Sequence, residues 1–250
     1  MDSHPALINL RGVSYRYPGG KTVLDRIDFK FIKGDRIGLV APNGSGKTTL
    51  FHVIMGLLKP SGGTIEIFGK ERRKEKDFTD IRHRIGLLFQ DADDQLFSPT
   101  VIEDVAFGPL NLGKSKQEAL DISRKTLDYL GLGDFENRIT FKLSGGEKRL
   151  VSLATILAMQ PEILLLDEPT NALDTSMKTR LIDILQGLDL SYILISHEFD
   201  VLSETTRTFY SMENGKLFRD DHVQVHTHQH SHKIGKRPHK HVQPFSPDIS

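Results

Sequence analysis

The chain has 250 residues, which fits one large α/β domain with a small insertion and is long enough to bury a core. Its 33 Lys and Arg balance its 33 Asp and Glu, so the overall charge does not indicate nucleic acid as a partner. Cysteine is absent, which excludes disulfides and thiolate metal sites and fits a reducing cytosol. No apolar run reaches the ~20 residues of a membrane span and no charged-then-apolar leader opens the chain, so we expect a soluble protein that reaches a membrane only through a partner.

Strands are predicted over residues 7–13 and 23–31, and a short apolar run over 37–40 predicts a buried strand. The loop after it reads Ala-Pro-Asn-Gly-Ser-Gly-Lys-Thr-Thr over residues 41–49, and a helical pattern runs from Lys47 to Met55 and stops at Gly56. Strand, glycine-rich loop and helix in this order are the context that a P-loop requires.

The loop residues predict a phosphate site. Gly44 and Gly46 lack a Cβ, so the backbone can take positive φ and aim successive N–H groups at phosphate oxygens, and the positive end of the helix adds to that field. Lys47 is predicted to reach the β- and γ-phosphates, and the Thr48 hydroxyl to ligate Mg²⁺. The predicted nucleotide contacts of the loop are Ala41, Pro42, Asn43, Gly44, Ser45, Gly46, Lys47, Thr48 and Thr49.

Ala41 and Tyr17 each need an interpretation. Ala41 stands where the P-loop motif has its first Gly, and it is excluded only if φ there is positive. Tyr17 lies beside a Pro-Gly-Gly turn, where a tyrosine is most often a cross-strand packing residue. Because Tyr17 comes shortly before a P-loop strand, we favour the interpretation that its ring is a face on which adenine stacks.

After the P-loop helix, a strand is predicted over 64–68, and the dense charge run 71–77 is interpreted as a solvated loop or helix face. The apolar run 85–89 predicts a buried strand that ends at Gln90. A polar residue at the carboxyl end of a parallel strand faces the ligand crevice of an open α/β sheet. Gln90 is therefore predicted to offer its amide oxygen to the metal or to the attacking water.

Residues 91–143 predict a helical insertion, with one helix led by Pro99-Thr100 to Phe107 and a second reaching Leu130. Ser115 and Glu118 form a capping box for the second helix. Ser144, Gly145 and Gly146 then precede a long helix to Met159 and make an exposed anion nest. Beside a P-loop, this nest suggests a second phosphate contact, which can act on a neighbouring subunit's nucleotide.

A wholly apolar strand, 163–166, ends in two carboxylates, for which a buried strand has no structural use. Asp167 is predicted to hold Mg²⁺, and Glu168 to act as general base on the attacking water. Asp174 is a natural N-cap for a helix to Leu185. His197 follows the apolar strand 192–195. A lone His is usually structural, but at this end of the sheet we favour a γ-phosphate contact.

In this order, the motifs resemble the nucleotide-binding subunit of ABC transporters over about residues 7–219. The motifs are APNGSGKTT for Walker A, Gln90 for the Q-loop, LSGGE for the signature, ILLLDE for Walker B, NALD with Asp174 for the D-loop and His197 for the switch histidine. Ala41, Glu147 and Asn171 depart from the common pattern and remove no group that does chemistry. The resemblance implies ATP hydrolysis with Mg²⁺ on an α/β P-loop NTPase fold, in which residues 1–219 form a RecA-like core sheet, an antiparallel β subdomain and a helical insertion.

Residues 89–100 and 103–109 resemble, more narrowly, the ATPase of the energy-coupling-factor class, especially its cobalt and nickel importers. Vitamin importers of that class are similar throughout this region, so the cargo stays open. The resemblance implies a head-to-tail dimer, with itself or a related ATPase, in which ATP lies between Lys47, Asp167 and Glu168 of one subunit and Ser144 to Gly146 of the other. It also implies a membrane subunit that docks near Gln90 and the insertion, and a peripheral place on the cytoplasmic face of the membrane.

The remaining residues, 220–250, hold seven of the 11 histidines among Lys, Pro, Ser and Gln, a composition typical of a disordered tail. A polar tail with accidental histidines or a tag remnant is the plain alternative, but the histidines are interleaved rather than consecutive. Imidazole without thiolate suits Ni²⁺, Co²⁺, Zn²⁺ or Cu²⁺. In an extended segment His226, His228, His230 and His232 alternate and can share one face.

Two other classes of function compete with a transport ATPase. A non-transport ABC ATPase acting on nucleic acid or translation usually has two ATPase domains or a basic extension, whereas this chain has one P-loop and balanced charge. A metal-storage protein or metallochaperone could use the tail but would not need the complete ATPase set. Co-purification with a membrane subunit discriminates among the three.

Overall fold

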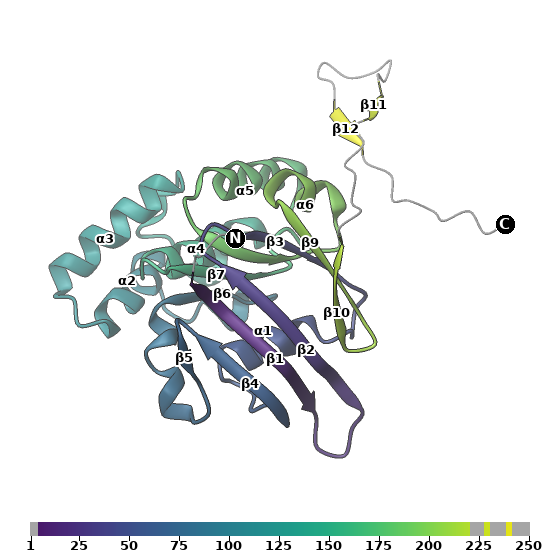
Figure 1. Cartoon of the computed structure of the whole chain (residues 1–250). Helices are drawn as coiled ribbons and strands as arrows, with labels where there is room; N and C mark the ends of the chain where they lie inside the picture. The colour runs from purple at the N-terminus through teal and green to yellow at the C-terminus, as the bar shows by residue number, and fades with distance from the viewer. Residues whose placement is uncertain (1–4, 221–227, 231–238, 242–250) are drawn as a thin grey trace.

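Residues 5–220 form two β-sheets with helices packed around them (Figure 1). A computed structural model describes residues 5–220 and the backbone of two short strands at 228–230 and 239–241. The smaller sheet is antiparallel, in the order β2-β1-β4-β5. Its strands are β1 (Ala6–Arg16), β2 (Thr22–Ile32), β4 (Gly62–Ile67) and β5 (Lys70–Glu71).

The larger sheet has the order β10-β9-β3-β8-β7-β6, in which β10 alone runs antiparallel to its neighbour. Its strands are β3 (Arg36–Val40), β6 (Ile85–Leu88), β7 (Ile163–Asp167), β8 (Ser191–Ile195), β9 (Thr208–Glu213) and β10 (Lys216–Asp220). The helices are α1 (Lys47–Ile54), α2 (Val101–Asn111), α3 (Lys116–Tyr129), α4 (Gly145–Leu157), α5 (Thr175–Gly187) and α6 (Phe199–Thr205). None of the helices in the described ranges is long and apolar enough to cross a bilayer.

Strands β6, β7 and β8 of the larger sheet are buried on both faces, which explains why they are apolar runs rather than alternating ones. On β7, Ile163 and Leu165 pack into a core shared with α1 and the antiparallel sheet. Leu164 and Leu166 pack into a second core with α4, α5 and α6. The period-two alternation of side chains along one strand thus joins the two layers of the protein.

The sheet order brings the predicted site residues to one edge. Strands β3, β8, β7 and β6 are consecutive neighbours and all parallel, so their carboxyl ends lie side by side. The glycine-rich loop follows β3, His197 follows β8, Glu168 follows Asp167 at the end of β7, and Gln90 follows β6. Residues separated by more than a hundred positions therefore converge, as expected for the ligand crevice of a parallel sheet.

The helical insertion forms a separate lobe made of α2 and α3, on the opposite side of the molecule from β9 and β10 (Figure 1). The capping box predicted for α3 is present, with the Ser115 N–H donating to Glu118 at 2.8 Å and the Glu118 N–H to the Ser115 hydroxyl at 3.3 Å. The predicted end of the first helix at Phe107 was too early, because α2 continues through Pro109. Gly113, at φ +81°, follows the helix and turns the chain away.

The charge run at 71–77 was only partly predicted. Most of it is exposed, as expected, but Arg72 is 6% exposed. Its guanidinium donates to the carbonyls of Ile67 and Asp77 and forms an ion pair with Asp80 at 2.7 Å. Buried carbonyls need donors, and a cation that closes several at once is retained inside despite its charge.

The segment after His197, for which no structure was predicted, forms α6, β9 and β10. Strand β9 pairs in parallel with β3, directly beside the strand that carries the P-loop. The turn to β10 is Asn214-Gly215, with φ +50° and +75°. Asn-Gly between two apolar stretches is a hairpin signal that was available in the sequence.

In the tail, β11 (His228–His230) pairs antiparallel with β12 (His239–His241). His228 is opposite His241 and His230 is opposite His239. Of the four histidines proposed as a group, His226 and His232 lie outside the described residues. The expected disorder of the tail stays a prediction.

Candidate active site

The glycine-rich loop has the backbone that phosphate binding requires. Gly44 and Gly46 take φ of +77° and +106°, whereas Ala41 is not among the residues with positive φ. A Cβ on Gly46 would lie 2.9 Å from Val23 Cγ1 and 3.0 Å from the Val23 carbonyl oxygen, so only glycine fits there. No side chain caps α1, which leaves the N–H groups of its first turn available to an anion.

Two carbonyl groups of the glycine-rich loop hold the side chain of Lys47. The side chain is 7% exposed, and Nζ donates to the carbonyls of Ala41 at 2.7 Å and Pro42 at 3.1 Å. Two carbonyl dipoles orient an ammonium group but do not neutralise it. A buried cation in this setting fits a phosphate group of the ligand.

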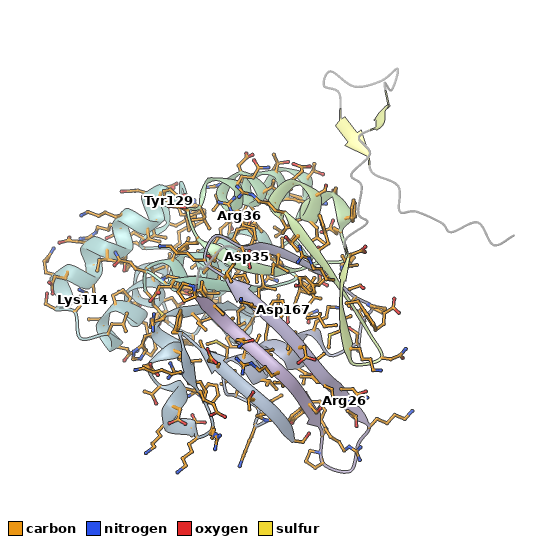
Figure 2. All side chains as sticks on the ribbon, viewed as in Figure 1. Arg26, Asp35, Arg36, Lys114, Tyr129 and Asp167 are labelled. Carbon is orange, nitrogen blue, oxygen red and sulfur yellow. The ribbon has the colours of Figure 1, made fainter. Side chains whose placement is uncertain are left out.

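Asp167 and Glu168 form a buried acid pair at the end of β7, exposed by 3% and 4%. In Figure 2 Asp167 is labelled near the middle of the view, whereas Lys114 and Arg26 are labelled near its outline. The Thr48 hydroxyl donates to Asp167 Oδ2 at 2.6 Å. Burial raises the pKa of Asp167, and the charge of Glu168 adds to the rise, against the Thr48 hydrogen bond.

One oxygen of each acid lacks a partner. Among the described residues, Asp167 Oδ1 and Glu168 Oε1 are buried and make no hydrogen bond, and the same holds for the Ser45 hydroxyl in the loop. Leaving a buried carboxylate oxygen unpaired is costly, and such groups in a native protein call for a ligand or ion. Hard oxygen donors from Thr48 and Asp167 are the set that Mg²⁺ takes beside substrate phosphates.

His197 meets Glu168 directly. Its Nδ1 lies 3.0 Å from Glu168 Oε2, while 63% of its side chain remains exposed. Glu168 takes φ +48°, a left-handed conformation that costs a non-glycine residue energy and is found at functional sites. The strained backbone is held by the Glu168 N–H, which donates to the Ile195 carbonyl of β8 at 3.0 Å.

Gln90 lies in a cleft of about 640 Å³ that Thr48 of α1, Gly145 of α4 and Asn171 after β7 also line. The structure therefore brings Gln90 together with the start of α4, which carries the LSGGE motif, and with α1, which follows the glycine-rich loop. The residue that fixes this loop was missed from the sequence: Arg149 of α4 is 5% exposed and donates to the carbonyls of Phe89 at 2.6 Å and Gln90 at 2.5 Å. Burial lowers the pKa of its guanidinium. The one signal for it was a cation immediately before the apolar helix residues that begin at Leu150.

The nest at the start of α4 is shaped by a second capping box. The Ser144 N–H donates to Glu147 at 2.8 Å, and the Ser144 hydroxyl accepts from the Glu147 N–H at 3.3 Å. The hydrogen bond from the Ser144 backbone lowers the pKa of Glu147 and keeps it ionised. Since these two N–H groups are used internally, the free donors of the nest are those of Gly145 and Gly146.

Asp174 is the N-cap of α5, as predicted, whereas the stacking of adenine on Tyr17 stays a prediction. The Tyr17 hydroxyl is 3.3 Å from Thr49 Oγ1, and its ring packs edge-on to Tyr15 with the centroids 4.9 Å apart. The ring is still 43% exposed, so packing and stacking are compatible. Asp174 caps α5 by accepting a hydrogen bond from the Met177 N–H at 2.9 Å. This bond is the main reason why the pKa of Asp174 is lowered.

Residues 24–171 match the family model described as ABC transporter. The chain belongs to this family. A putative ABC transporter ATP-binding protein of Nitratidesulfovibrio vulgaris is 47% identical over 94% of this chain and 86% of its own length. The energy-coupling factor transporter ATP-binding protein EcfA of Methanothermobacter thermautotrophicus is 42% identical over 86% and 70%.

Among solved structures, cbiO1 from Clostridium perfringens, part of the ABC transporter complex cbiONQ, superposes with a TM-score of 0.77. It is 31% identical and covers 85% of this chain and 87% of its own. The two sheets and the helical lobe are thus the ABC ATPase fold, and the cofactors of this domain are ATP and Mg²⁺. Membership of this family implies ATP hydrolysis.

Proposed function

We propose that this chain is the ATP-hydrolysing subunit of an energy-coupling-factor importer and that its cargo is nickel or cobalt ion. Similarity to EcfA and to cbiO1 supports the class of transporter. The resemblance of residues 89–100 and 103–109 to cobalt and nickel importers supports the cargo. The observation that carries the proposal is the cleft that Gln90 shares with the start of α4 and with α1. An exposed aromatic groove, lined by Phe97 and Phe141, borders this cleft.

In this proposal each residue of the ATP site has one task. Lys47 neutralises charge on the β- and γ-phosphates, while Thr48 and Asp167 hold Mg²⁺, which screens the charge that develops on the phosphate oxygens. Glu168 takes a proton from the attacking water through its unpartnered Oε1. His197, bonded to the other oxygen of Glu168, contacts the γ-phosphate, and Gln90 orients the water or the metal.

The signature nest serves the nucleotide of a second subunit. In the described part of the chain, the capping box uses the N–H groups of Ser144 and Glu147 and leaves those of Gly145 and Gly146 at the start of α4 for an anion. An anion nest on an exposed helix start is completed by a phosphate from another molecule. A head-to-tail dimer, of two copies or of this chain with a related ATPase, places each ATP between the loop at Lys47 and the partner's nest.

The membrane subunit docks in the aromatic groove. A cavity of about 310 Å³ is lined by Phe97, Pro99, Thr140 and Phe141, with Phe97 and Phe141 exposed by 66% and 73%. Buried Asp104 of α2 accepts from the N–H groups of Phe97 at 3.1 Å and Ser98 at 2.9 Å, so the groove is built rather than accidental. Exposed aromatic side chains around a built hollow mark a protein interface. Docking there holds the ATPase on the cytoplasmic face of the membrane.

The tail supplies a second, separate candidate activity, the binding of Ni²⁺, Co²⁺ or Zn²⁺. The backbone of β11 pairs with that of β12 so that His228 is opposite His241 and His230 is opposite His239. Neutral imidazoles in such numbers suit late transition metals.

The transport proposal is tested by co-expressing the chain with its membrane subunits and following ATP-dependent accumulation of radioactive nickel and cobalt in membrane vesicles. Accumulation should require ATP and should be lost with Lys47→Ala, while Lys33→Ala, an exposed change before β3 and so at the opposite end of that strand from the loop, serves as the matched control. Vesicles that accumulate a vitamin and neither metal would reassign the cargo. An absence of any membrane partner would favour a non-transport ABC ATPase.

A further inference from the structure

Glu198, the residue after His197, joins the loops that follow the two central strands. Its Oε1 accepts from the Thr170 hydroxyl at 2.6 Å, and its Oε2 accepts from the Lys178 ammonium at 2.5 Å. Thr170 lies in the loop after β7 and Lys178 lies on α5, whereas Glu198 belongs to the loop after β8. One carboxylate thus connects the segment of Glu168 to that of His197.

The contacts of Glu198 are largely shielded from solvent, and the charge of its partner Lys178 is balanced by two carboxylates. Thr170 is 3% exposed, and the side chains of Lys178 and Glu198 are 19% and 28% exposed. Lys178 also pairs with Asp200 on α6 at 2.9 Å. Burial opposes the charge on Lys178, but the hydrogen bonds to Glu198 and Asp200 outweigh it, and the pKa of the ammonium is raised.

His197 has few other restraints. Backbone hydrogen bonds hold the chain as far as Ser196, whose N–H donates to Leu39 and whose hydroxyl accepts from the Glu198 N–H at 3.0 Å. Within the described ranges, the His197 ring then bonds to Glu168 alone, and most of its surface is exposed. An exposed imidazole can take several rotamers unless the neighbouring chain is held in place, and the side chain of Glu198 is the further restraint available here.

We propose that Glu198 is a positioning residue for ATP hydrolysis: by bridging Thr170 and Lys178, it holds the loop of His197 at hydrogen-bond distance from Glu168. The proposal rests on hydrolysis of ATP at the acid pair. The same bridge fixes α5, whose first residue follows Asp174, so the loop that leads into α5 and the His197 loop move together. Loss of the bridge frees His197 from Glu168 while leaving the P-loop untouched.

The test is a double-mutant cycle between Glu198→Gln and His197→Ala, with kcat and KM for ATP measured on the full chain. Gln keeps the volume of Glu198 but places an amide or a neutral oxygen against the Lys178 ammonium. We expect kcat to fall roughly 10-fold with KM unchanged, a loss below the ~10²-fold that a misplacement of 1 Å can cause. In the His197→Ala background the same change should cost less than about 2-fold, because residues acting as one unit are not additive.

A second pair of variants keeps the proposal testable if Glu198→Gln folds poorly. Lys178→Met should reproduce the loss in kcat, and Lys178→Arg, which restores a donor to Glu198, should recover most of it. Glu204→Gln on the same helix α6, an exposed residue, is the matched control and should change neither constant.

The opposing hypothesis is that the bridge only clasps α5 to α6. In that case the thermal unfolding midpoint falls in the Glu198 and Lys178 variants, but kcat is retained. Any fall in kcat that Glu198→Gln does cause is then the same with and without the His197 side chain. Either of the last two results overturns the proposal. A parent chain without ATP turnover, or with turnover that survives Glu168→Gln, would instead refute hydrolysis at the acid pair and is recognised before the cycle is measured.

Discussion

Replacing Glu168 by Gln is the most direct test of the chemistry. The change keeps the size of a side chain that is 4% exposed, and it removes the charge that lets Oε1 take a proton. Removal of a general base typically lowers the rate by roughly 10²- to 10⁴-fold. Because the carboxylate makes its hydrogen bond to His197 rather than to the loop of Lys47, nucleotide affinity should be retained.

The assay separates binding from turnover. Single-turnover hydrolysis of radioactive ATP gives the chemical step, and a fluorescent nucleotide analogue gives the dissociation constant with Mg²⁺ present. ATP-bound dimers of the variant should accumulate and be visible by size-exclusion chromatography. Glu162→Gln, at the other end of β7 and paired with Arg84 on the surface, is the control and should turn over normally. Equal turnover by Glu168→Gln and the parent would refute Glu168 as the base.

Three further outcomes are expected. Lys47→Ala should weaken nucleotide binding itself, measured by calorimetry, because the phosphates lose the buried cation held at Ala41 and Pro42. Mixing Glu168→Gln chains with Gly146→Asp chains should give dimers with one intact site and measurable turnover, and a mixture as inactive as its components would contradict a nest that serves the partner's nucleotide. Ending the chain after Asp221 should abolish most Ni²⁺ binding in calorimetric titration and leave ATP turnover nearly unchanged; unchanged Ni²⁺ binding would refute the tail site.

Local chemistry explains what could be predicted from the sequence. A P-loop is recognisable because strand, glycines, lysine and helix must be contiguous, and the positive φ of Gly44 and Gly46 confirms that prediction. Asp167 was recognisable because a carboxylate has no structural use at the end of an apolar strand. The capping residues Ser115 and Asp174 were predicted because each one bonds to a backbone N–H only three residues further along the chain.

Contacts between distant segments explain what was missed. Arg72 and Arg149 look like ordinary surface cations in the sequence, and only the fold shows the buried carbonyls that each one serves. The bridge from Glu198 to Thr170 and Lys178 spans 28 and 20 positions and has no local pattern. Strand β9 was missed for a different reason, because its Asn-Gly turn was present but was not weighed.

The last prediction concerns the cost of keeping an acid buried for Mg²⁺. Burial raises the pKa of Asp167, and the Glu168 charge adds to the rise, so the ionised form destabilises the folded chain when no cation is bound. Asp167→Asn removes that charge while its carbonyl oxygen can still accept from Thr48. Without Mg·ATP the variant should therefore unfold at a higher temperature than the parent, by about 2–4 °C for each kcal/mol gained.

The pH dependence fixes the sign of this effect. A carboxyl whose pKa is raised by folding contributes stability that is fully present below its unfolded pKa and is lost as the pH rises through its folded pKa. The advantage of Asp167→Asn over the parent should thus be largest at neutral pH and should shrink on acidification, as the parent's carboxyl becomes protonated. Adding Mg·ATP should reverse the order, since ligand binding stabilises only the chain that can hold the cation. Thermal scans of both chains across pH, with and without Mg·ATP, measure all three effects. A variant less stable than the parent at neutral pH without ligand would show that Asp167 is held ionised by the fold itself, and that the unpartnered Oδ1 is not the place prepared for Mg²⁺.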